Sequence, residues 1–585
     1  MTTIMGKRGT PTRRFRIIAA WALSLIAVFT VIGLVGYRLM PRTDEPLIIA
    51  YGHSDGQQSP ANTTWGATVA EACDCTITWR DVTPQSEERR YIYGLTSYDA
   101  FPEWTKPDVF VSFDGITSHD RIELVNGTKG YLDFRGYLNR LPNVAQYFER
   151  VPQAKAIAQQ NDGSIVSIPG DAGEDWNGSM AHLFINRTWL DRLGLQPPTT
   201  WDELRDVLVA FRDQDPNGNG QADEIPFALR PTVDNPDDPL EQPYQLSNDG
   251  WHLFMNSTGV PTQLNEPAGW DKYAVRQGTI WNYADSSQLR QVAAFLMSLT
   301  AEGLIVDDVF TRAYAEKQNQ EALRAQYELG KYDESSPVNT QVGMSFTQYE
   351  ATLAANTPVV GAAFVFDESA FGPNASQYES ITMPAANAGE QVTWDYSARA
   401  RFNLAGVSVR DDTEHLDQAL KAVDALFSEE VSLGQYYGDG NATIAKKNNG
   451  TTIVQVAGDG TYANGYGRSF VGWIRPGTTI VNDKPRDRYL AAERPYQSIW
   501  QRMQGDGIIP VGMYSSDYDT GINSEADAWM SEWALTATPG STLTDGMWND
   551  YLQALDDVDF TSVRDTRIAA WQQLYDHYIT RYQSD

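Results

Sequence analysis

Oxygen-bearing side chains follow one another along residues 215–224 at the spacing that a calcium ion requires. They fall at positions 1, 3, 5 and 9 of an EF-hand-type loop, namely Asp215, Asn217, Asn219 and Asp223. Gly220 stands at the sixth position, where such a loop must turn sharply. Hard oxygen donors with no His or Cys nearby favour calcium over zinc and magnesium. The spacing predicts one structural calcium ion, bound by Asp215, Asn217, Asn219, the Gln221 carbonyl, Asp223 and Glu224.

The loop departs from a complete EF-hand at its last carboxylate. Glu224 stands at the tenth position, whereas the EF-hand places this ligand at the twelfth. We therefore expect a compact calcium loop without the exiting helix of an EF-hand. A polar Asn/Gly turn that binds no metal is the alternative.

A helix is predicted to lead directly into this loop. Thr200 and Glu203 have the spacing of a capping box, in which a hydroxyl and a carboxylate satisfy the free amides of a helix start. Apolar residues recur behind them at helical spacing, at Leu204, Val207, Leu208 and Phe211.

The stretch around this helix also resembles a known family. INRTWLDRLGL, PPTTWDEL and DPNGNGQADEIP succeed one another between residues 185 and 226, as in the extracellular solute-binding proteins of family 1, in the branch of lipoproteins and alginate-oligosaccharide-binding proteins. Weaker matches follow in the same order, at LTAEGLIVDDVF (299–310), QVGMSF (341–346), ALKAVDALFSEEVSLGQYYGDG (419–440) and WNDYLQAL (548–555). The resemblance implies the substrate-binding subunit of an ABC importer, with membrane-spanning permease subunits and an ATPase as partners.

The fold implied is α/β, of the type II periplasmic-binding-protein kind, with two lobes, a hinge and a ligand cleft. The chain is expected to cross to the second lobe near 165–170 and to return near 402–409. Lobe 1 would then hold residues 47–167 and about 402–455, and lobe 2 about 168–401 and 456–585, including the calcium loop 215–224. The protein is expected to be a monomer.

Short apolar runs separated by helical or turn-rich stretches predict the first parallel sheet. They are residues 47–51, 76–82 and 108–113. Because ligands bind beyond the carboxyl ends of such strands, Tyr51 to His53 and Phe113 to Gly115 are predicted at the edge of the cleft, with Tyr51 and Asp114 as ligand-binding residues.

Aromatic residues suggest the class of ligand. The 17 Trp and 29 Tyr supply flat faces that can stack on sugar rings, so an oligosaccharide is the expected solute. Trp176, Trp394 and Trp473, which lie near the predicted crossings or in a Gly-rich segment, are the predicted stacking residues. Packing in a core is the alternative for each of them.

The N-terminus predicts a membrane anchor. A basic segment, 1–16, precedes the uncharged run Ile17 to Tyr37, which is long enough to span a bilayer at about 20 residues. We expect an uncleaved transmembrane helix at 17–37, a tether at 38–46 and a body on the extracytoplasmic side of the cell membrane. Secretion after cleavage of a signal peptide is the alternative. No Cys precedes Cys73, so a lipid anchor on a Cys just after the signal is excluded.

The rest of the chain is strongly acidic. Residues 1–43 hold 7 basic and no acidic side chains, which leaves 38 basic against 76 acidic ones and a net charge of −38. This charge argues against nucleic acid as a partner. It also disfavours a polyanionic ligand, unless a local cluster such as Arg399 and Arg401 overrides it.

Several chemistries find no support in the sequence. The six His have no metal-ligand spacing, which makes a catalytic zinc site unexpected, and neither G-x-S-x-G nor a phosphate-binding Gly-rich loop is present. Cys73 and Cys75 are compatible with a disulfide or with two free thiols.

The sequence thus predicts a non-enzymatic binding protein that captures an oligosaccharide between two lobes and delivers it to a permease. One alternative is an enzyme that acts on the same polysaccharide, with Glu174 and Asp175 as acid and base. A surface sensor or adhesion protein is the other alternative.

The anchor gives the first testable prediction. Mature protein should stay with the membrane fraction and keep the residues before Arg38. Intact-mass measurement checks this directly, and a mass that starts near Asp44, together with recovery in the soluble fraction, would show cleavage instead.

Overall fold

The computed structural model describes most of the chain after residue 44. The described ranges are 45–53, 57–83, 107–112, 130–159, 162–230, 250–262, 273–306, 346–394, 400–448, 451–457, 465–503, 540–557, 560–562, 564–566, 568–569, 572–573 and 575–576. The predicted cytoplasmic segment, the transmembrane run 17–37 and Asp114 lie outside them. Within these ranges, no helix combines the length and the apolar character needed to cross a bilayer.

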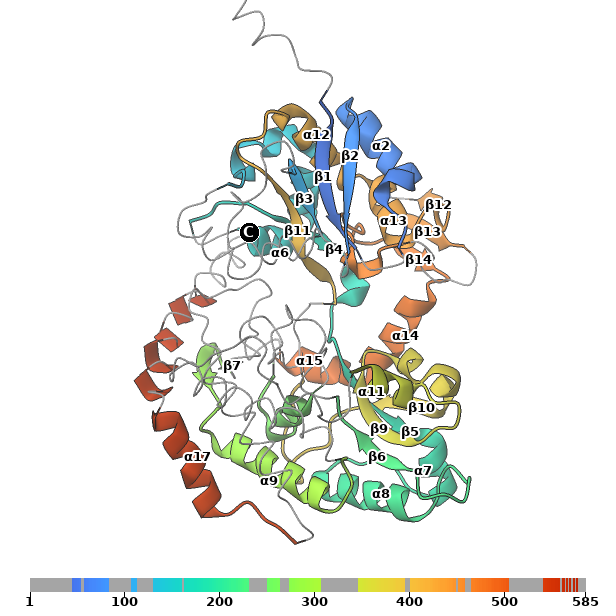
Figure 1. The fold of residues 1–585 in the computed structure, drawn as a ribbon, viewed down its shortest axis with the longest axis vertical. Coiled ribbons are helices and arrows are strands. Elements are labelled where there is room, and N and C mark those ends of the chain that lie inside the picture. Colours follow the sequence, from blue (N-terminus) through green and yellow to red (C-terminus); the bar gives the residue numbers. More distant parts are fainter. Residues whose placement is uncertain are drawn as a thin grey trace, which may run out of the picture.

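The elements gather into two α/β lobes, one above the other in Figure 1. The first lobe is built on a five-stranded sheet of order β2-β1-β3-β11-β4. Its strands are β1 (Leu47–Gly52), β2 (Ile77–Val82), β3 (Val109–Val111), β4 (Ile168–Asp171) and β11 (Phe402–Val409). The three runs predicted as strands are therefore present, and β1 pairs in parallel with both β2 and β3.

One strand of this sheet returns from far along the chain. β11 runs antiparallel between β3 and β4, with a register shift between Asn403 and Val407. Gly406 allows this shift, because a Cβ there would lie 2.7 Å from the Ile168 carbonyl oxygen and its φ is +53°. The return crossing predicted near 402–409 thus ends in a strand of the first sheet.

Helices cover the first sheet. They are α2 (Thr64–Cys73), α5 (Pro142–Arg150), α6 (Pro152–Ala158), α12 (Leu416–Leu426) and α13 (Glu429–Tyr437). The side chain of Thr63 caps α2, and the buried face of that helix carries Trp65 and Val69. Short 3-10 helices, η1 (Pro60–Asn62), η4 (Phe134–Gly136) and η5 (Leu138–Arg140), occupy the connections.

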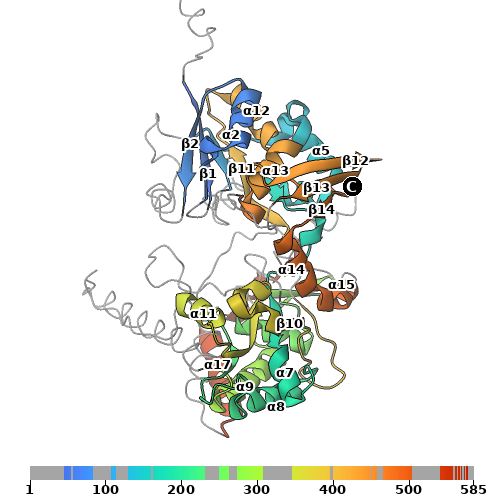
Figure 2. The ribbon, with the colours of Figure 1, turned by 90° about the vertical axis from the view of Figure 1, so that its right-hand side faces the viewer.

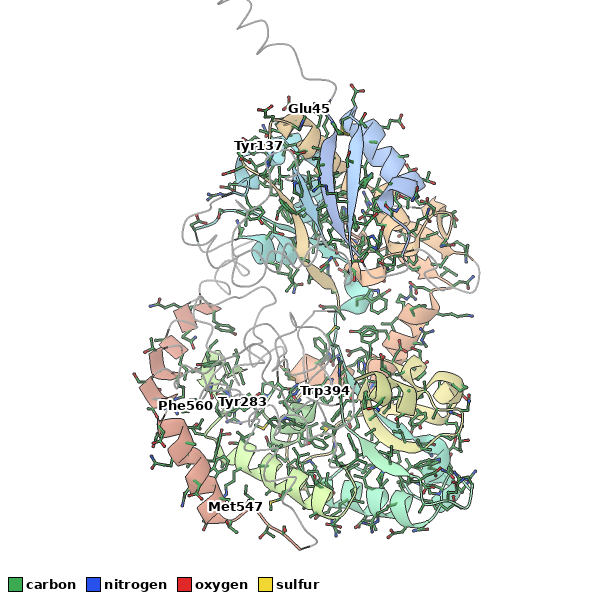
Figure 3. All side chains as sticks on the ribbon, viewed as in Figure 1. Glu45, Tyr137, Tyr283, Trp394, Met547 and Phe560 are labelled. Atoms are coloured by element: carbon green, nitrogen blue, oxygen red, sulfur yellow. A yellow bond between two sulfur atoms is a disulfide. The ribbon has the colours of Figure 1, made fainter. Side chains whose placement is uncertain are left out.

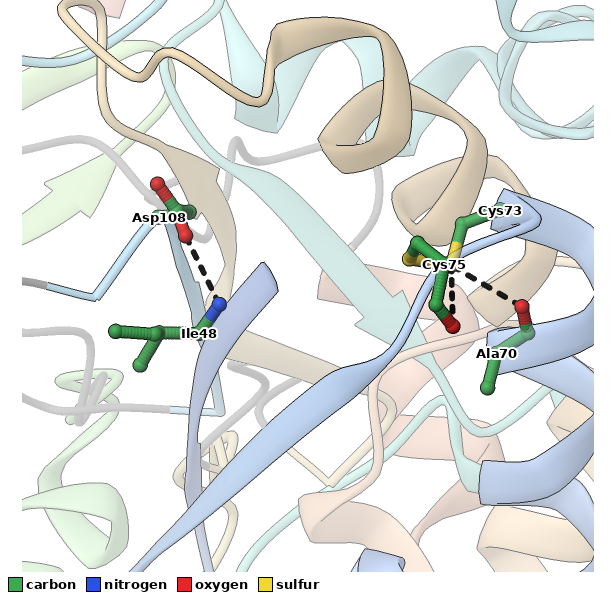
Figure 4. The surroundings of a disulfide bond; sticks show 5 residues. All are labelled: Ile48, Ala70, Cys73, Cys75 and Asp108. Carbon is green, nitrogen blue, oxygen red and sulfur yellow. Dashed lines mark hydrogen bonds between the residues drawn. A yellow bond between two sulfur atoms is a disulfide. The ribbon is translucent and has the colours of Figure 1, made fainter. Parts of the chain in front are cut away.

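The two cysteines form a disulfide (Figure 4). Cys73 is the last residue of α2, and Cys75 leads into β2. Asp74 between them ends the helix in the left-handed conformation, with φ 51°. Of the two states that the sequence left open, the structure contains the bonded one.

The second lobe contains a four-stranded sheet of order β10-β5-β9-β6. Its strands are β5 (His182–Asn186), β6 (Ile225–Ala228), β9 (Val360–Val365) and β10 (Tyr378–Ile381). Around it lie α7 (Arg187–Leu193), α8 (Trp201–Asp213), α9 (Ser287–Ala301), α11 (Phe346–Leu353), α15 (Gln497–Met503), α17 (Asp545–Asp557) and the hairpin of β7 (Tyr273–Arg276) and β8 (Thr279–Asn282). The 3-10 helices η7 (Trp251–Thr258), η8 (Glu368–Gln377) and η10 (Arg494–Tyr496) complete the lobe.

The helix predicted before the calcium loop is α8. Its apolar face, Leu204, Val207, Leu208 and Phe211, is buried as predicted. Only half of the predicted capping box forms: Thr200 Oγ1 accepts from the Glu203 amide at 3.3 Å. The Glu203 carboxylate accepts from the amide and hydroxyl of Thr199 at 2.8 and 2.7 Å, so it caps one residue earlier than predicted.

The first lobe extends beyond the predicted boundaries. β4 completes its sheet, and Phe470, Val471 and Trp473 belong to its hydrophobic core. A small sheet of β12 (Ala442–Asn448), β13 (Thr451–Val456) and β14 (Thr479–Val481) lies beside it, and α14 (Lys484–Glu493) then leads to the second lobe (Figures 1 and 2). The boundaries at 167 and 455 therefore precede residues that pack in the first lobe, because lobe membership depends on tertiary contacts between distant segments.

Candidate functional site

The predicted calcium loop connects α8 to β6 and is folded around Asp215. The Asp215 carboxylate accepts hydrogen bonds from the amides of Gly218 and Gly220 at 3.0 Å and of Asn219 at 3.1 Å. Gly218 and Gly220 both have φ 75°, which glycine adopts without steric cost. The predicted sharp turn is thus present.

The remaining predicted ligands converge on Asp223. The side-chain amides of Asn217 and Asn219 donate to its Oδ1 at 3.0 Å each. An Asn amide turned by half a rotation presents oxygen in place of nitrogen, so both residues can offer oxygen donors at this point. Gln221 follows, with its amide bonded to Asn219 Oδ1 at 2.7 Å.

Glu224 contributes a buried carboxylate oxygen to the loop. Its Oε1 is buried and has no hydrogen-bond partner among the described residues. Burial, and then the charges of Asp223 and Asp215, raise the pKa of this carboxyl. A cation would relieve both effects, so these residues fit a calcium ion. In the described ranges, no three His, Cys, Asp or Glu side chains are grouped so that they could hold a metal ion by themselves. A calcium ion in this loop would therefore also need the oxygens of Asn217, Asn219 and the Gln221 carbonyl.

Tyr51 lies at the carboxyl end of β1, where the sequence predicted it, within a cluster of rings. Its ring stacks on Tyr466 at a centroid distance of 5.0 Å and contacts Trp65 at 5.7 Å and Trp79 at 6.2 Å. The Tyr51 hydroxyl donates to Gln435 Oε1 at 2.7 Å, and the side chain is fully buried. Burial, and then the nearby Tyr466, raise the Tyr51 pKa far above its usual range.

Two more polar residues lie at the same edge: His53, within the predicted stretch 51–53, and Asp81, which was not predicted. His53 Nε2 lies 3.1 Å from Asp81 Oδ1, and the His53 ring is 5.7 Å from Tyr466. Asp81 stands at the end of β2, so the rule that selected Tyr51 also selects Asp81. Tyr466 is distant in sequence, and no local pattern marks it.

A third cluster lies where the chain crosses between the lobes. Among the described residues, these crossings contain residues 172–181, residues 400–401 and α14 with η10 (Figure 1). At the first two, Arg401 donates to both oxygens of Asp171, with Nε–Oδ1 2.8 Å and Nη2–Oδ2 2.9 Å. Because this pair is buried, Arg401 is not the free cation for an anionic ligand that the sequence suggested.

The three predicted stacking tryptophans pack near these crossings. The ring of Trp176 is tilted against that of Tyr489 at a centroid distance of 4.8 Å, and the ring of Trp394 lies 4.6 Å from that of Tyr496 in the second lobe (Figure 3). The indole of Trp394 donates to the Ala181 carbonyl at 3.1 Å, and that of Trp473 donates to the Phe427 carbonyl at 2.9 Å. All three side chains are at most 2% exposed. Their predicted contact with a sugar stays a prediction.

Glu493 at the end of α14 is a buried carboxylate that the sequence did not mark. It accepts from His182 Nε2 at 3.1 Å, from Trp500 Nε1 at 3.1 Å and from the Ser179 amide. Burial raises the pKa of Glu493, but the hydrogen bond and charge of His182, with the bonds from Ser179 and Trp500, hold it below the usual range.

Two lobes on separate sheets, joined by repeated crossings, define the class of two-lobed solute-binding proteins. No model of a known protein family matches the chain. The HMO-binding, ABC-transporter-associated solute-binding protein of Bifidobacterium longum infantis aligns over 92% of this chain and 99% of its own, at 26% identity and a TM-score of 0.72. The Streptococcus pneumoniae ABC-transporter substrate-binding protein FusA, solved in complex with kestose, aligns over 92% of this chain at 18% identity and a TM-score of 0.63, and so shares the fold.

A curated relative agrees with the structural matches. The fructooligosaccharide ABC transporter substrate-binding protein FusA of Streptococcus pneumoniae is 31% identical over 176 residues, which are 29% of this chain and 29% of the relative. The matched segment thus spans less than a third of that relative. These findings confirm the resemblance seen in the sequence: the homologues of this chain are substrate-binding proteins of ABC transporters.

The buried tryptophans give the second prediction. Trp394→Ala should lower the free energy of unfolding by about 3–5 kcal/mol, because it removes a buried indole and its packing. Chemical denaturation checks this, with Trp281→Ala, at a half-buried residue of β8, as a milder comparison. An unchanged unfolding free energy, together with a selective loss of sugar affinity, would contradict the packing role and favour the stacking role.

Proposed function

We propose that this chain is the extracytoplasmic solute-binding subunit of an ABC importer, and that it captures an oligosaccharide between its lobes and delivers it to permease subunits. The observation that carries the proposal is the alignment of both lobes with an HMO-binding solute-binding protein over 92% of the chain, at 26% identity. The match to a fructooligosaccharide-binding relative supports the same class of solute.

We further propose that the carboxyl edge of the first sheet forms one wall of the ligand site. Parallel strands end there at Tyr51 and near Asp81, and ligands of α/β proteins bind beyond such ends. Among the described rings around Tyr51, the half-buried Trp79 supplies apolar surface, and the partly exposed carboxylate of Asp81, paired with His53, supplies a polar group. Asp114, which follows β3, stays a predicted member of this wall, and Trp176, Trp394 and Trp473 stay predicted stacking residues near the crossings.

A binding role is favoured over the enzymatic alternative. Asp175 lies 3.5 Å from Arg486 and serves as an ion-pair partner, while Glu174 precedes it in the same turn of the η6 helix (Glu174–Trp176). Adjacent residues of one turn do not flank a bond from two sides, as acid and base must in a glycosidase.

We also propose that residues 215–224 hold a structural calcium ion. Asp215, Asp223 and Glu224 would supply charge, Asn217 and Asn219 their side-chain oxygens, and Gln221 its carbonyl. The buried orphan oxygen of Glu224 supports this assignment. The ion would neutralise the carboxylates and hold the loop, which lies beyond α8 on the side of the second lobe away from the first (Figure 1).

The N-terminal anchor, the position of the body outside the cell membrane and the monomeric state complete the proposal. The homologues are substrate-binding proteins of ABC transporters, and a neighbour from Bifidobacterium longum subsp. infantis at 26% identity is an extracellular solute-binding protein, which favours this location. Release after signal cleavage remains the alternative.

Binding without turnover is the third prediction. Calorimetric titration with a panel of neutral oligosaccharides that includes kestose should detect saturable binding, and chromatography should recover the sugar intact. Hydrolysis of the bound sugar would overturn the capture role. Absence of binding across fructose-based, milk-type and plant oligosaccharides would contradict the proposed class of solute.

The calcium loop gives the fourth prediction. Chelation should lower the melting temperature, because a ligand bound only by the native state stabilises it by mass action. Asp223→Ala should abolish the calcium-dependent part of this stability and leave sugar affinity nearly unchanged.

Asp202→Ala, at an exposed residue of the preceding helix α8, is the matched control and should keep the calcium response. If chelation does not move the melting temperature, the loop is only a polar turn.

A further inference from the structure

The carboxylate of Glu493 accepts hydrogen bonds from separate segments of the region that joins the two lobes. We call this region the interlobe joint. Ser179, whose amide donates to Oε1, lies in the first crossing, and His182, whose Nε2 is 3.1 Å from the same oxygen, begins β5. Trp500, on α15, donates to Oε2 at 3.1 Å. Glu493 itself ends α14, the last crossing. One buried charge thus joins the first crossing, the last crossing and the sheet of the second lobe.

The backbone of the first crossing is shaped to reach this carboxylate. A Cβ on Gly178 would lie 2.3 Å from Glu493 Oε1 and 2.3 Å from the Tyr489 hydroxyl. Only glycine therefore allows the Ser179 amide to approach. The close contact is between backbone and a buried side chain, so neither partner can move aside easily.

The imidazole of His182 is held between two acceptors. Its Nδ1 is 2.7 Å from the Phe366 carbonyl oxygen, and its Nε2 faces Glu493. The Phe366 ring in turn stacks on Tyr489 at 5.1 Å, and Tyr489 contacts Trp176 at 4.8 Å. The polar contacts and the stacked rings therefore fix α14 against the first crossing from two directions.

A second polar contact joins the same two segments farther from Glu493. Arg486, near the start of α14, lies 3.5 Å from Asp175 of the first crossing. The Asp175 side chain is 47% exposed, so solvent weakens this pair. Glu493 is the buried link, and separating it from its donors would leave a charge without partners in the protein interior.

We propose that Glu493 is a positioning residue that sets the relative orientation of the two lobes by locking the first crossing to the last. Lobe motion then pivots about a joint in which α14 and residues 176–182 move together. An effect of this contact on solute capture rests on the proposed function, but the contact between the first and the last crossing does not.

The test compares interlobe distances without any ligand. Nitroxide labels on Glu149→Cys, exposed on α5, and Asp206→Cys, exposed on α8, report the separation of the lobes, while the native cysteines are bonded to each other. Glu493→Gln keeps the size of the side chain but places an amide N–H against donors. We expect a broader distance distribution and amide exchange at Ser179 faster by about tenfold or more, a loss of about 1.4 kcal/mol.

Two controls and a second variant make the test decisive. Glu350→Gln, at an exposed residue of α11, should leave the interlobe distances and the amide exchange at Ser179 unchanged. Gly178→Ala keeps the charge of Glu493 but pushes its carboxylate away from the Ser179 amide. It should therefore also broaden the distribution of interlobe distances. Gly136→Ala, where a Cβ meets no atom within 4 Å, is its control. Because Glu493→Gln and Gly178→Ala break one contact, their effects should not add.

Several results would overturn the proposal. If both variants lower the melting temperature but leave the interlobe distances and the Ser179 exchange of the folded protein unchanged, Glu493 contributes only to stability. Additive effects would also contradict the lock. If Glu493→Gln does not fold, Gly178→Ala decides alone. Because no sugar is present, the outcome is independent of whether oligosaccharide binding is confirmed.

Discussion

A charge can stay buried only while its partners stay beside it, and this constraint governs the region that joins the two lobes. Asp171 is held by Arg401 through two hydrogen bonds, and Glu493 is held by His182, Trp500 and the Ser179 amide. These contacts connect segments that are far apart in sequence. The first sheet itself requires the return of the chain, because β11 lies between β3 and β4, and the joint likewise needs segments from before and after the crossings.

The aromatic residues fall into two groups, one near the joint and one at the edge of the first sheet. Trp176 and Trp394 pack near the joint, where their rings contact Tyr489 and Tyr496. The rings at the end of β1 surround Tyr51 instead, at the sheet edge where α/β folds present their ligands. The joint is thus densely packed, whereas the sheet edge carries the partly exposed carboxylate of Asp81 beside the buried rings.

Local patterns in the sequence predicted the local structure well. The α8 helix, its buried face and the turn at Gly220 follow from spacing and capping chemistry within a few residues. The first three strands of the first lobe were predicted because parallel strands are continuous apolar runs. The oxygen donors of residues 215–224 also lie together, because they belong to one loop.

Contacts between distant segments could not be predicted in this way. Glu493 and His182 carry no local signal, and their pairing depends on the packing of α14 against β5. Arg401 looked like a free cation because its partner, Asp171, lies on another strand. For the same reason the predicted first lobe ended at 455, although Trp473 packs in its core.

We propose that the two lobes close around an oligosaccharide. Small-angle X-ray scattering of the protein, alone and saturated with the sugar that binds in calorimetry, tests it most directly. We expect a smaller radius of gyration in the complex, with unchanged secondary structure. Binding that leaves the radius of gyration unchanged would contradict it.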